Sequence, residues 1–347
     1  MWGPEDTNAW RAQHGSDPQP SPTVYVGSPI LDGPQPVWPG SIAIEDEAQA
    51  RRAVGRYKDH GAEFIKVYSL LPRDAYFGIA DESRKRGISF VGHIPVAVRI
   101  EEASEAGQKS IEHLGGMALG CSSEGDALFA ESQHAPRGVQ GRVTARAFKT
   151  YDEAKAQALF ARLKKNGTWQ CPTLTVLRSG ALVNDPEFVK DERVKYVPAA
   201  NRAAWNPNKD NTAEDWAARK TRWEESFKMV GRMHRAGVSI IAGTDVMNPY
   251  CFPGFSLHDE LALLVEAGLS PMEALEASTI SVARFMGQLD RRGTIETGKI
   301  ADLLLLEKSP LADIHNTRTI NAVVLRGKLI SRAALDQMLK DAEAAAR

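Results

Sequence analysis

The feature that most constrains this chain is the alternation of short apolar segments with longer helical segments between residues 23 and 286. Apolar runs of about four to eight residues, bounded by glycine or proline, are typical of buried strands. Longer amphipathic stretches that end at glycine are typical of helices. Strands that alternate with helices are predicted to lie parallel, because each helix returns the chain to the edge where the next strand begins. The alternation therefore predicts an α/β fold.

The individual elements follow from these patterns. Strands are predicted at 23–26, 63–68, 88–91, 110–113, 169–176 and 238–242. Helices are predicted at 45–60, 72–86, 101–106, 151–166, 216–235 and from 270 to about 286. The last helix begins with Ser270, Pro271 and Glu273, which form a capping box. The mixed, proline-broken stretch 177–215 is predicted to be a lid or a binding loop, because long connections usually have such roles.

The pattern changes from Gly293 onward, where strands at 301–307 and 322–326 have turn residues between them and no long helix. A small antiparallel β unit is predicted there, followed by an alanine-rich helix that begins at Arg332. The predicted division is one large domain over residues 1–290 and a smaller one over residues 291–347. A chain of 347 residues is long enough for this arrangement.

Composition limits the classes of partner. The net charge of −1 gives no strong field for nucleic acid or an anionic membrane, and no apolar run is long enough to span a bilayer. The three cysteines, Cys121, Cys171 and Cys251, lie far apart and match no zinc or redox spacing. Neither nucleic acid nor a membrane is therefore expected as a partner, and a disulfide scaffold is not expected.

Asp245 follows the apolar run 238–242, two residues after Gly243. A carboxylate at the end of a buried strand is costly to desolvate unless a positive charge or a metal faces it. In α/β barrels the catalytic groups gather at that end of the strands. Two interpretations stay open at this point: a catalytic carboxylate, or a residue that only caps the following turn.

Three more polar residues occupy comparable positions: Lys66 lies in the strand 63–68, His93 follows the strand 88–91, and His113 ends the strand 110–113. Each has a simpler explanation, a lysine that extends to the surface or a hydrogen-bonded core histidine. Together they indicate a metal site, because imidazole nitrogen and carboxylate oxygen are preferred ligands of zinc. A buried lysine favours its neutral form, and the neutral amine can add carbon dioxide to give a carbamate ligand.

These residues stand in four short motifs: Phe64-Ile-Lys66-Val-Tyr, Gly92-His93-Ile-Pro, Ile111-Glu-His113-Leu and Ala242-Gly-Thr-Asp245. With the segments 257–275 and 293–304, the motifs resemble the metal-dependent amidohydrolase superfamily, in particular its imidazolonepropionase-like and prolidase-like branch. The resemblance implies a (β/α)8 TIM-type barrel and a divalent metal such as Zn²⁺. It places a carbamylated Lys66 on strand 4, His93 and His113 on strands 5 and 6, and Asp245 on strand 8. It further implies that a metal-activated water attacks a carbonyl while Asp245 takes and returns the proton.

The family's His-x-His pair on barrel strand 1 has no counterpart here. We therefore expect an N-terminally truncated barrel that lacks strands 1 and 2, with one or two metal ions and impaired activity. Open sheet edges would cause poor solubility unless another chain fills the gap, as in a homo-oligomer. The chain as given has no export signal, which indicates the cytoplasm; a lost N-terminal signal would make it secreted or periplasmic.

Three functions are consistent with these motifs and with the resemblance. The leading one is hydrolysis of a carbon–nitrogen bond in an amide, a dipeptide or a cyclic amide. The second is a non-catalytic remnant that binds a small molecule or a partner chain, and the third is a metal-free enzyme with Lys66 as a Schiff-base nucleophile. Tyr68, which shares the strand face of Lys66, and His258, beyond the last strand, are predicted to bind substrate, although packing and an ordinary helix start are the alternatives.

Overall fold

The computed structural model describes residues 7–14, 21–136, 139–205 and 211–347. Its contacts divide the chain into two compact units. The first runs up to Gln170 and includes Ala236–Ser239, and the second comprises Cys171–Arg235 and Ile240–Arg347. The predicted division near residue 290 stays a prediction.

A six-stranded sheet with the order β2-β1-β3-β4-β5-β6 forms the centre of the first unit. Its strands are β1 (Gly27–Asp32), β2 (Ile42–Ala43), β3 (Phe64–Val67), β4 (Ser89–Gly92), β5 (Ser110–Glu112) and β6 (Trp169–Cys171). The pairs from β2 through β5 are parallel, which confirms the predicted α/β class. Closure of this sheet into an eight-stranded barrel, and the absence of two barrel strands, stay predictions.

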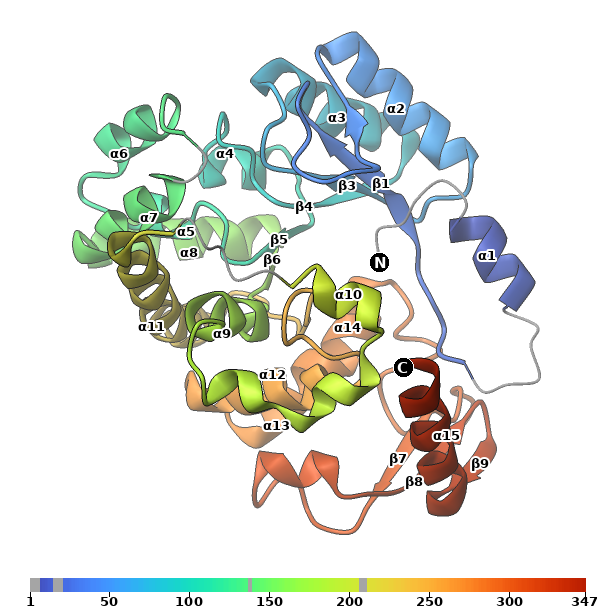
Figure 1. Cartoon of the computed structure of the whole chain (residues 1–347). Helices are drawn as coiled ribbons and strands as arrows, with labels where there is room; N and C mark the ends of the chain where they lie inside the picture. The colour runs from blue at the N-terminus through green and yellow to red at the C-terminus, as the bar shows by residue number, and fades with distance from the viewer. Residues whose placement is uncertain (1–6, 15–20, 137–138, 206–210) are drawn as a thin grey trace. The chain divides into compact units, whose positions relative to one another are not determined.

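In the described part of the first unit, one helix precedes β1 in the chain, and the other helices are in the connections between strands. The helices are α1 (Thr7–His14), α2 (Glu47–Asp59), α3 (Arg73–Arg86), α4 (Ile100–Glu105), α5 (Met117–Gly120), α6 (Gly125–Ser132), α7 (Gln140–Lys149) and α8 (Glu153–Asn166). Helices α2 and α3 lie side by side, with α2 against β3 and α3 against β4 (Figure 1). Val54 and Tyr76 of these helices share a buried core with Ile65 of β3 and Phe90 of β4. This apolar layer holds the strands whose ends carry the candidate site.

The first predicted strand was placed too early, because the strand is Gly27–Asp32 and not 23–26. Glycine and proline are uncommon inside strands, but both fit this strand for local reasons. A Cβ on Gly27 would lie 2.3 Å from the ring of Phe64, so only glycine allows β1 and β3 to approach. Pro29 falls where the β1–β3 register shifts between Gly27 and Ile30, a point at which a missing N–H is tolerated.

The predicted strand 169–176 ends after three residues, at Cys171. Pro172 cannot donate a ladder hydrogen bond, and Thr173 adopts a left-handed φ of 48°. Helix α9 (Leu174–Leu182) then begins within the segment that had been predicted as strand. A short apolar run does not distinguish strand from helix, and the error comes from that ambiguity.

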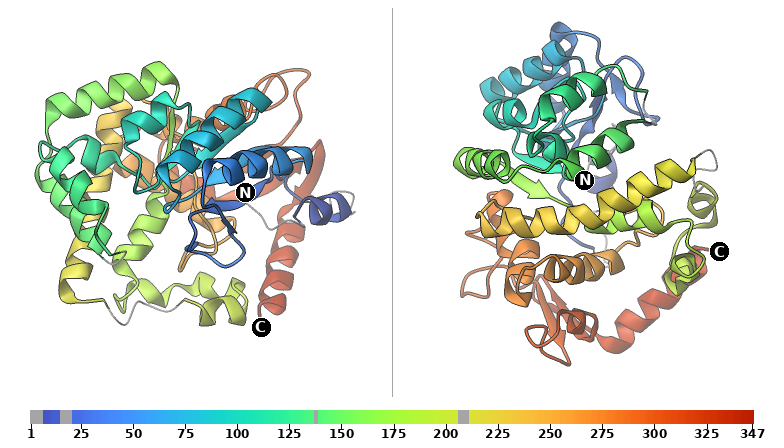
Figure 2. Two further views of the ribbon diagram at one scale, coloured as in Figure 1. Left: turned by 90° about the horizontal axis from the view of Figure 1, so that it is seen from above. Right: turned by 90° about the vertical axis from the view of Figure 1, so that its left-hand side faces the viewer.

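The second unit is mostly helical. After α9 its elements are η2 (Phe188–Lys190), η3 (Glu192–Tyr196), α10 (Ala199–Ala203), α11 (Ala213–Arg235), α12 (Phe255–Glu266), α13 (Pro271–Ser278) and α14 (Ile280–Phe285). The predicted lid, 177–215, thus contains several short helices where it is described. Helix α11 runs straight and is seen along its length in the right panel of Figure 2.

The predicted strand 238–242 is not a strand in the structure. Its burial was foreseen correctly, since Val238 and Ile241 are buried. However, a strand requires a ladder of hydrogen bonds, and this run has isolated ones. Ser239 O accepts from Gln170 N at 2.8 Å, and Ala242 N donates to Ala277 O at 2.9 Å. Hydrophobic periodicity reports burial and cannot report whether a neighbouring strand is available.

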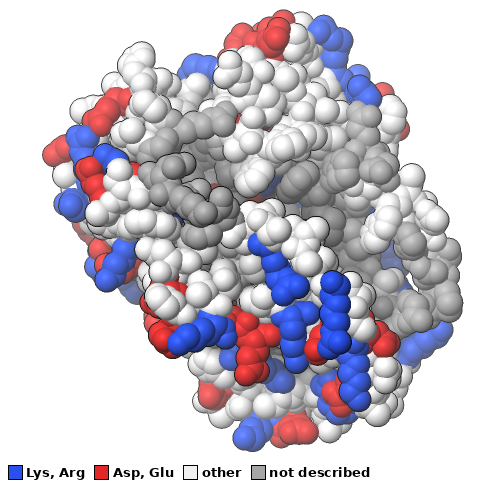
Figure 3. Space-filling model, in the orientation of Figure 1, with Lys and Arg blue, Asp and Glu red and all other residues white. Residues whose placement is uncertain are grey.

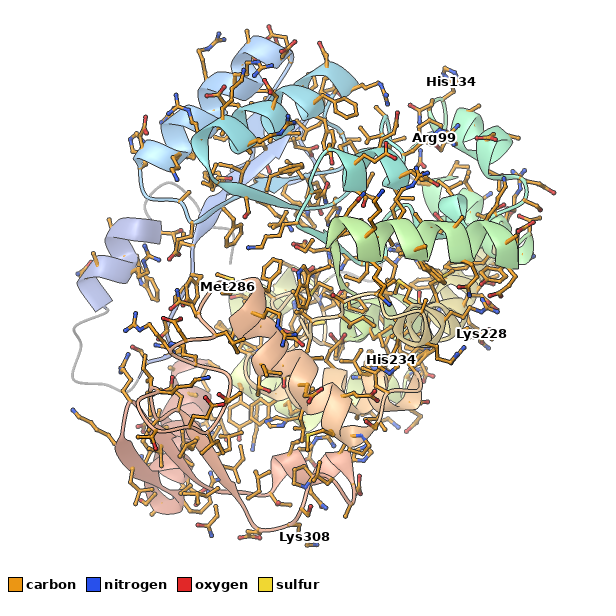
Figure 4. All side chains as sticks on the ribbon, turned by 180° about the vertical axis from the view of Figure 1, so that it is seen from behind. Arg99, His134, Lys228, His234, Met286 and Lys308 are labelled. Carbon is orange, nitrogen blue, oxygen red and sulfur yellow. The ribbon has the colours of Figure 1, made fainter. Side chains whose placement is uncertain are left out.

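The capping box at Ser270 and Glu273 is present and begins α13 as predicted. The predicted single helix to about residue 286 is interrupted at Thr279, whose φ of −126° and ψ of −90° are not helical. The hydroxyls of Ser278 and Thr279 both donate to Leu275 O, and such bonds compete with the helical pattern. Glu273 also contacts His234 at the end of α11 at 3.1 Å; His234 is labelled in Figure 4.

The predicted C-terminal β unit is a three-stranded antiparallel sheet, β7 (Leu303–Leu306), β8 (Ile320–Leu325) and β9 (Lys328–Ser331). The turn η4 (Ile314–Arg318) precedes β8, and the helix α15 (Arg332–Ala345) begins at the predicted residue. No helix in the described part of the chain is both long and apolar enough to cross a membrane. Acidic and basic side chains are intermingled on the face shown in Figure 3, as the small net charge suggests.

Candidate active site

Three of the predicted site residues meet at one edge of the sheet in the first unit. Lys66 lies in β3, His93 directly follows β4, and His113 directly follows β5. Because β3, β4 and β5 are parallel neighbours, their carboxyl ends lie together. Gly92 makes the close approach possible, since a Cβ there would lie 2.3 Å from Val67 O. His93 N then donates to Val67 O at 3.1 Å and continues the ladder by one residue.

Lys66 is buried with 6% of its surface exposed, and its ammonium pairs with the carboxylate of Glu112. Burial alone would raise the pKa of Glu112. The opposing effects of the charge on Lys66, the neighbouring His113 and the hydrogen bond from Lys66 are larger together, and they lower that pKa below its ordinary value. Glu112 is therefore ionised, and the structure shows Lys66 in an ion pair.

The ring of His93 is fixed from two sides. It stacks on Tyr68 with ring centroids 3.9 Å apart, and its Nδ1 is hydrogen-bonded to the Ser69 hydroxyl at 2.9 Å. It also meets the ring of His113 edge to face at 4.8 Å. When Nδ1 donates to Ser69, the lone pair lies on Nε2, and this is the tautomer that a metal-binding histidine requires.

Glu112 is the functional candidate that the sequence analysis missed. Adjacent residues of a strand point to opposite faces, so Glu112 and His113 were not expected to act together. The strand ends at Glu112, however, and His113 has a left-handed φ of 55°. This turn brings His113 Nε2 to 3.9 Å from a Glu112 oxygen. The available signal was His113 itself, because histidine is one of the residues enriched at positive φ.

His93, Glu112 and His113 form a three-residue set that fits a divalent metal. One ligand atom from each residue lies within 4.8 Å of the other two. Ligands at about 2.1 Å from a tetrahedral zinc would be about 3.4 Å apart, a separation that lies within this limit. Two imidazoles and one carboxylate are also the donor types that a catalytic zinc commonly uses. A carbamate on Lys66 stays a prediction.

Tyr68 and Asp32 complete the surroundings of this edge. Tyr68 lies one residue beyond β3, half-buried, and its hydroxyl accepts from Trp38 Nε1 at 2.7 Å. Asp32 ends β1 and is fully buried, and its two oxygens accept from Leu70 N at 2.7 Å and Val37 N at 2.9 Å. Asp32 therefore organises the loops, while Tyr68 remains a candidate substrate contact beside His93.

Asp245 belongs to the second unit and lies on a loop, Thr244–Pro249. Its side chain is exposed, its φ is 48°, and its Oδ2 accepts from Asn248 Nδ2 at 2.8 Å. These contacts are those of a turn, one of the two interpretations left open by the sequence. Its predicted roles in metal binding and proton transfer stay predictions.

Gly243, just before this loop, packs against the strand end at Cys171. A Cβ at Gly243 would lie 2.3 Å from Cys171 Sγ and 3.6 Å from the Thr173 side chain. Glycine is therefore required here by close approach. From the predicted lid, Trp205 Nε1 donates to Met247 O at 3.3 Å, so the same loop is also contacted from that segment.

His258 is half-buried on α12 in the second unit. Burial is the main reason that its pKa is lowered, with a smaller contribution from Arg318, so the neutral ring is favoured. Among the described residues its buried Nδ1 has no hydrogen-bond partner. The next residue, Asp259, is buried among Arg178, Arg193 and Arg318. The substrate-binding role of His258 stays a prediction.

Comparison with known proteins agrees with these motifs. The model of the family described as "Amidohydrolase family" matches residues 71–330, about three quarters of the chain. An imidazolonepropionase of Deinococcus deserti is 41% identical over 87 residues, which are 25% of this chain and 21% of that protein. One of Symbiobacterium thermophilum is 33% identical over 103 residues, 28% of this chain and 24% of that protein. The matches thus span only about a fifth to a quarter of these relatives.

Solved structures with the same fold cover nearly the whole chain. A bottromycin amidohydrolase has a TM-score of 0.75 at 23% identity and covers 98% of this chain and 71% of that chain. A Xaa-Pro dipeptidase with bound methionine has a TM-score of 0.63 at 17% identity and covers 93% and 72%. At these identities the likeness shows the fold alone. Together, the family match and these neighbours confirm the predicted resemblance to the imidazolonepropionase-like and prolidase-like branch.

Proposed function

This chain belongs to the amidohydrolase family, and from that premise we propose that it hydrolyses a carbon–nitrogen bond in an amide, a dipeptide or a cyclic amide. The observation that carries the proposal is the set of His93, Glu112 and His113 at the carboxyl edge of a parallel sheet. Members of this family are generally metal-dependent. A set of two imidazoles and a carboxylate matches that requirement without any help from the second unit.

In this proposal His93 and His113 hold a zinc or a related divalent ion, and Glu112 supplies a carboxylate oxygen. When bound, the metal would lower the pKa of a water and polarise the substrate carbonyl. Ser69 would keep His93 in the required tautomer by accepting a hydrogen bond from Nδ1. Lys66 keeps Glu112 ionised and oriented, and it would carry the carbamate if that modification forms.

Asp245 is proposed to take the proton from the attacking water and return it to the leaving amine. Its exposed side chain supports this role, because a general base must be able to reach the water from which it takes a proton. Tyr68 is proposed to donate a hydrogen bond to the substrate from its place beside His93. His258 is proposed as a second substrate contact in its neutral form.

The substrate class is proposed from the names of the similar proteins. Imidazolonepropionase and Xaa-Pro dipeptidase indicate a cyclic amide or a peptide bond to proline. The test is hydrolysis of a panel that contains imidazolonepropionate, Xaa-Pro dipeptides and N-acyl amino acids. We expect one member to be hydrolysed by the zinc-loaded chain, and the activity to disappear with a chelator and return with zinc.

The non-catalytic alternative has one observation in its favour: Lys66 and Glu112 neutralise each other without a metal. It predicts a folded chain that neither binds zinc nor hydrolyses any member of the panel. The Schiff-base alternative is disfavoured, because the Lys66 amine is engaged by the Glu112 carboxylate and is not directed at a substrate carbonyl. Failure of borohydride to trap an adduct with the carbonyl substrates would eliminate it.

A further inference from the structure

Glu260 is a fully buried carboxylate in the second unit that the proposed reaction does not use. It lies on α12, and its two oxygens accept from the first two backbone amides of α9. Oε1 accepts from Leu174 N at 2.9 Å and Oε2 from Thr175 N at 2.8 Å, both in buried surroundings. The start of a helix has amides without partners inside the helix, and Glu260 satisfies two of them.

The pKa of Glu260 depends on two opposing effects, burial and hydrogen bonding. Burial raises the pKa of Glu260 to about 7, while hydrogen bonds from the amides of Thr175 and Leu174 and from the Thr175 side chain act in the opposite direction. The positive end of the α9 dipole also favours an anion at this position. At pH 8 the carboxylate is ionised, and it holds the start of α9 with two charge-assisted hydrogen bonds.

Helix α9 in turn holds the loop that carries Asp245. The hydroxyl of Thr175 donates to Thr244 O at 3.4 Å, and the hydroxyl of Ser179 donates to Pro249 O. These two carbonyls lie at the two ends of the loop Thr244–Pro249, with Asp245 between them. The contacts come from one face of α9, because residues four apart in a helix lie one above the other.

We propose that Glu260 is a positioning residue for Asp245. It fixes the first turn of α9, and α9 fixes both ends of the Asp245 loop through Thr175 and Ser179. The consequence for catalysis rests on the proposed function of Asp245, but the structural consequence, a loop kept in one conformation, does not. A carboxylate that only stabilised the fold would affect the whole second unit and not this loop in particular.

Hydrogen exchange on the full chain at pH 8 tests the structural consequence. Peptides that span residues 242–252 report the loop, and peptides from the middle of α11 report the rest of the second unit. We expect Glu260→Gln to accelerate exchange in the loop at least about tenfold, because an amide side chain accepts only one of the two bonds. Glu266→Gln is the matched control, an exposed glutamate near the end of the same helix.

The double variant Thr175→Val/Ser179→Ala keeps Glu260 and both backbone amides. It removes the two bonds to the loop, together with the hydrogen bond between the Thr175 side chain and Glu260. It should reproduce the loop exchange of Glu260→Gln with unchanged α11 peptides. The proposal is overturned if loop exchange is unchanged in a folded Glu260→Gln variant, or if all peptides accelerate equally. If Glu260→Gln does not fold, unchanged loop exchange in the double variant overturns it.

Kinetics on whichever panel substrate is hydrolysed separates this inference from the proposed function. We expect the double variant to lower kcat about tenfold with little change in KM, because Asp245 is misplaced while the metal cluster is intact. Normal kcat with faster loop exchange would confine Glu260 to structure and overturn its effect on Asp245. If the wild-type chain hydrolyses nothing, the proposed function fails, while the exchange experiment still decides whether Glu260 positions the loop.

Discussion

The two regions that carry the predicted site residues are built in opposite ways. Around Lys66, His93 and His113 the backbone is held by a parallel ladder, and the side chains are held by stacking and an ion pair. Around Asp245 the backbone is an exposed loop held from outside by α9 and Trp205. The difference suggests that the histidine cluster is preorganised by the fold, whereas the carboxylate depends on neighbours that a single substitution can remove.

The largest expected effect is the loss of catalytic rate in Asp245→Asn. If Asp245 is the general base, kcat falls by about 10²–10⁴-fold. The free energy of unfolding changes by less than about 0.5 kcal/mol, because the side chain is exposed. Steady-state kinetics and urea unfolding measure the two quantities, with the exposed Asp290→Asn as control. Retained activity would remove Asp245 from the mechanism and leave it as a turn residue.

Substitution in the Lys66–Glu112 pair of the first unit, unlike Asp245→Asn, should lower the stability of the fold even without metal. Lys66→Met leaves Glu112 without its cation and is expected to cost about 2–3 kcal/mol, less than for a fully buried pair since Glu112 is 20% exposed. Lys66→Met/Glu112→Leu should cost clearly less than the sum of the single changes. Urea unfolding of the chelated chain measures this, and additive costs would show that the pair is not coupled.

A smaller effect on stability is expected at Gly243, which precedes the Asp245 loop. Gly243→Ala places a Cβ against Cys171 Sγ and should cost about 1–3 kcal/mol from overpacking. Cys171→Ala in the same chain should restore part of that loss by making room. The helical Gly180→Ala is the matched control, because its Cβ would meet nothing closer than 3.5 Å. No recovery in the double variant would mean that backbone strain, and not the sulfur, is responsible.

Part of the fold and the site could be predicted because strand ends obey a simple rule. Parallel strands end at the same edge, so Lys66, His93 and His113 could be grouped from sequence alone, and the structure brings them together. Glu112 could not be added, because alternation along a strand places it on the face opposite His113. The positive φ of His113 that changes this is favoured by histidine but is not fixed by residue type alone. The prediction of a strand at 238–242 was wrong for a similar reason. The sequence pattern indicates burial, but it does not indicate whether a neighbouring strand is present to form hydrogen bonds.

The central claim is that His93, Glu112 and His113 form a metal site within the first unit. The most direct test is the zinc content of the purified full-length chain after equilibration with zinc and removal of the excess. We predict about one zinc per wild-type chain and per His134→Ala chain, whose histidine is exposed elsewhere in the same unit and is labelled in Figure 4. Less than about a tenth should remain in His93→Ala or His113→Ala, with an intermediate loss in Glu112→Gln. Full zinc content in the His93→Ala or His113→Ala chain would contradict the account.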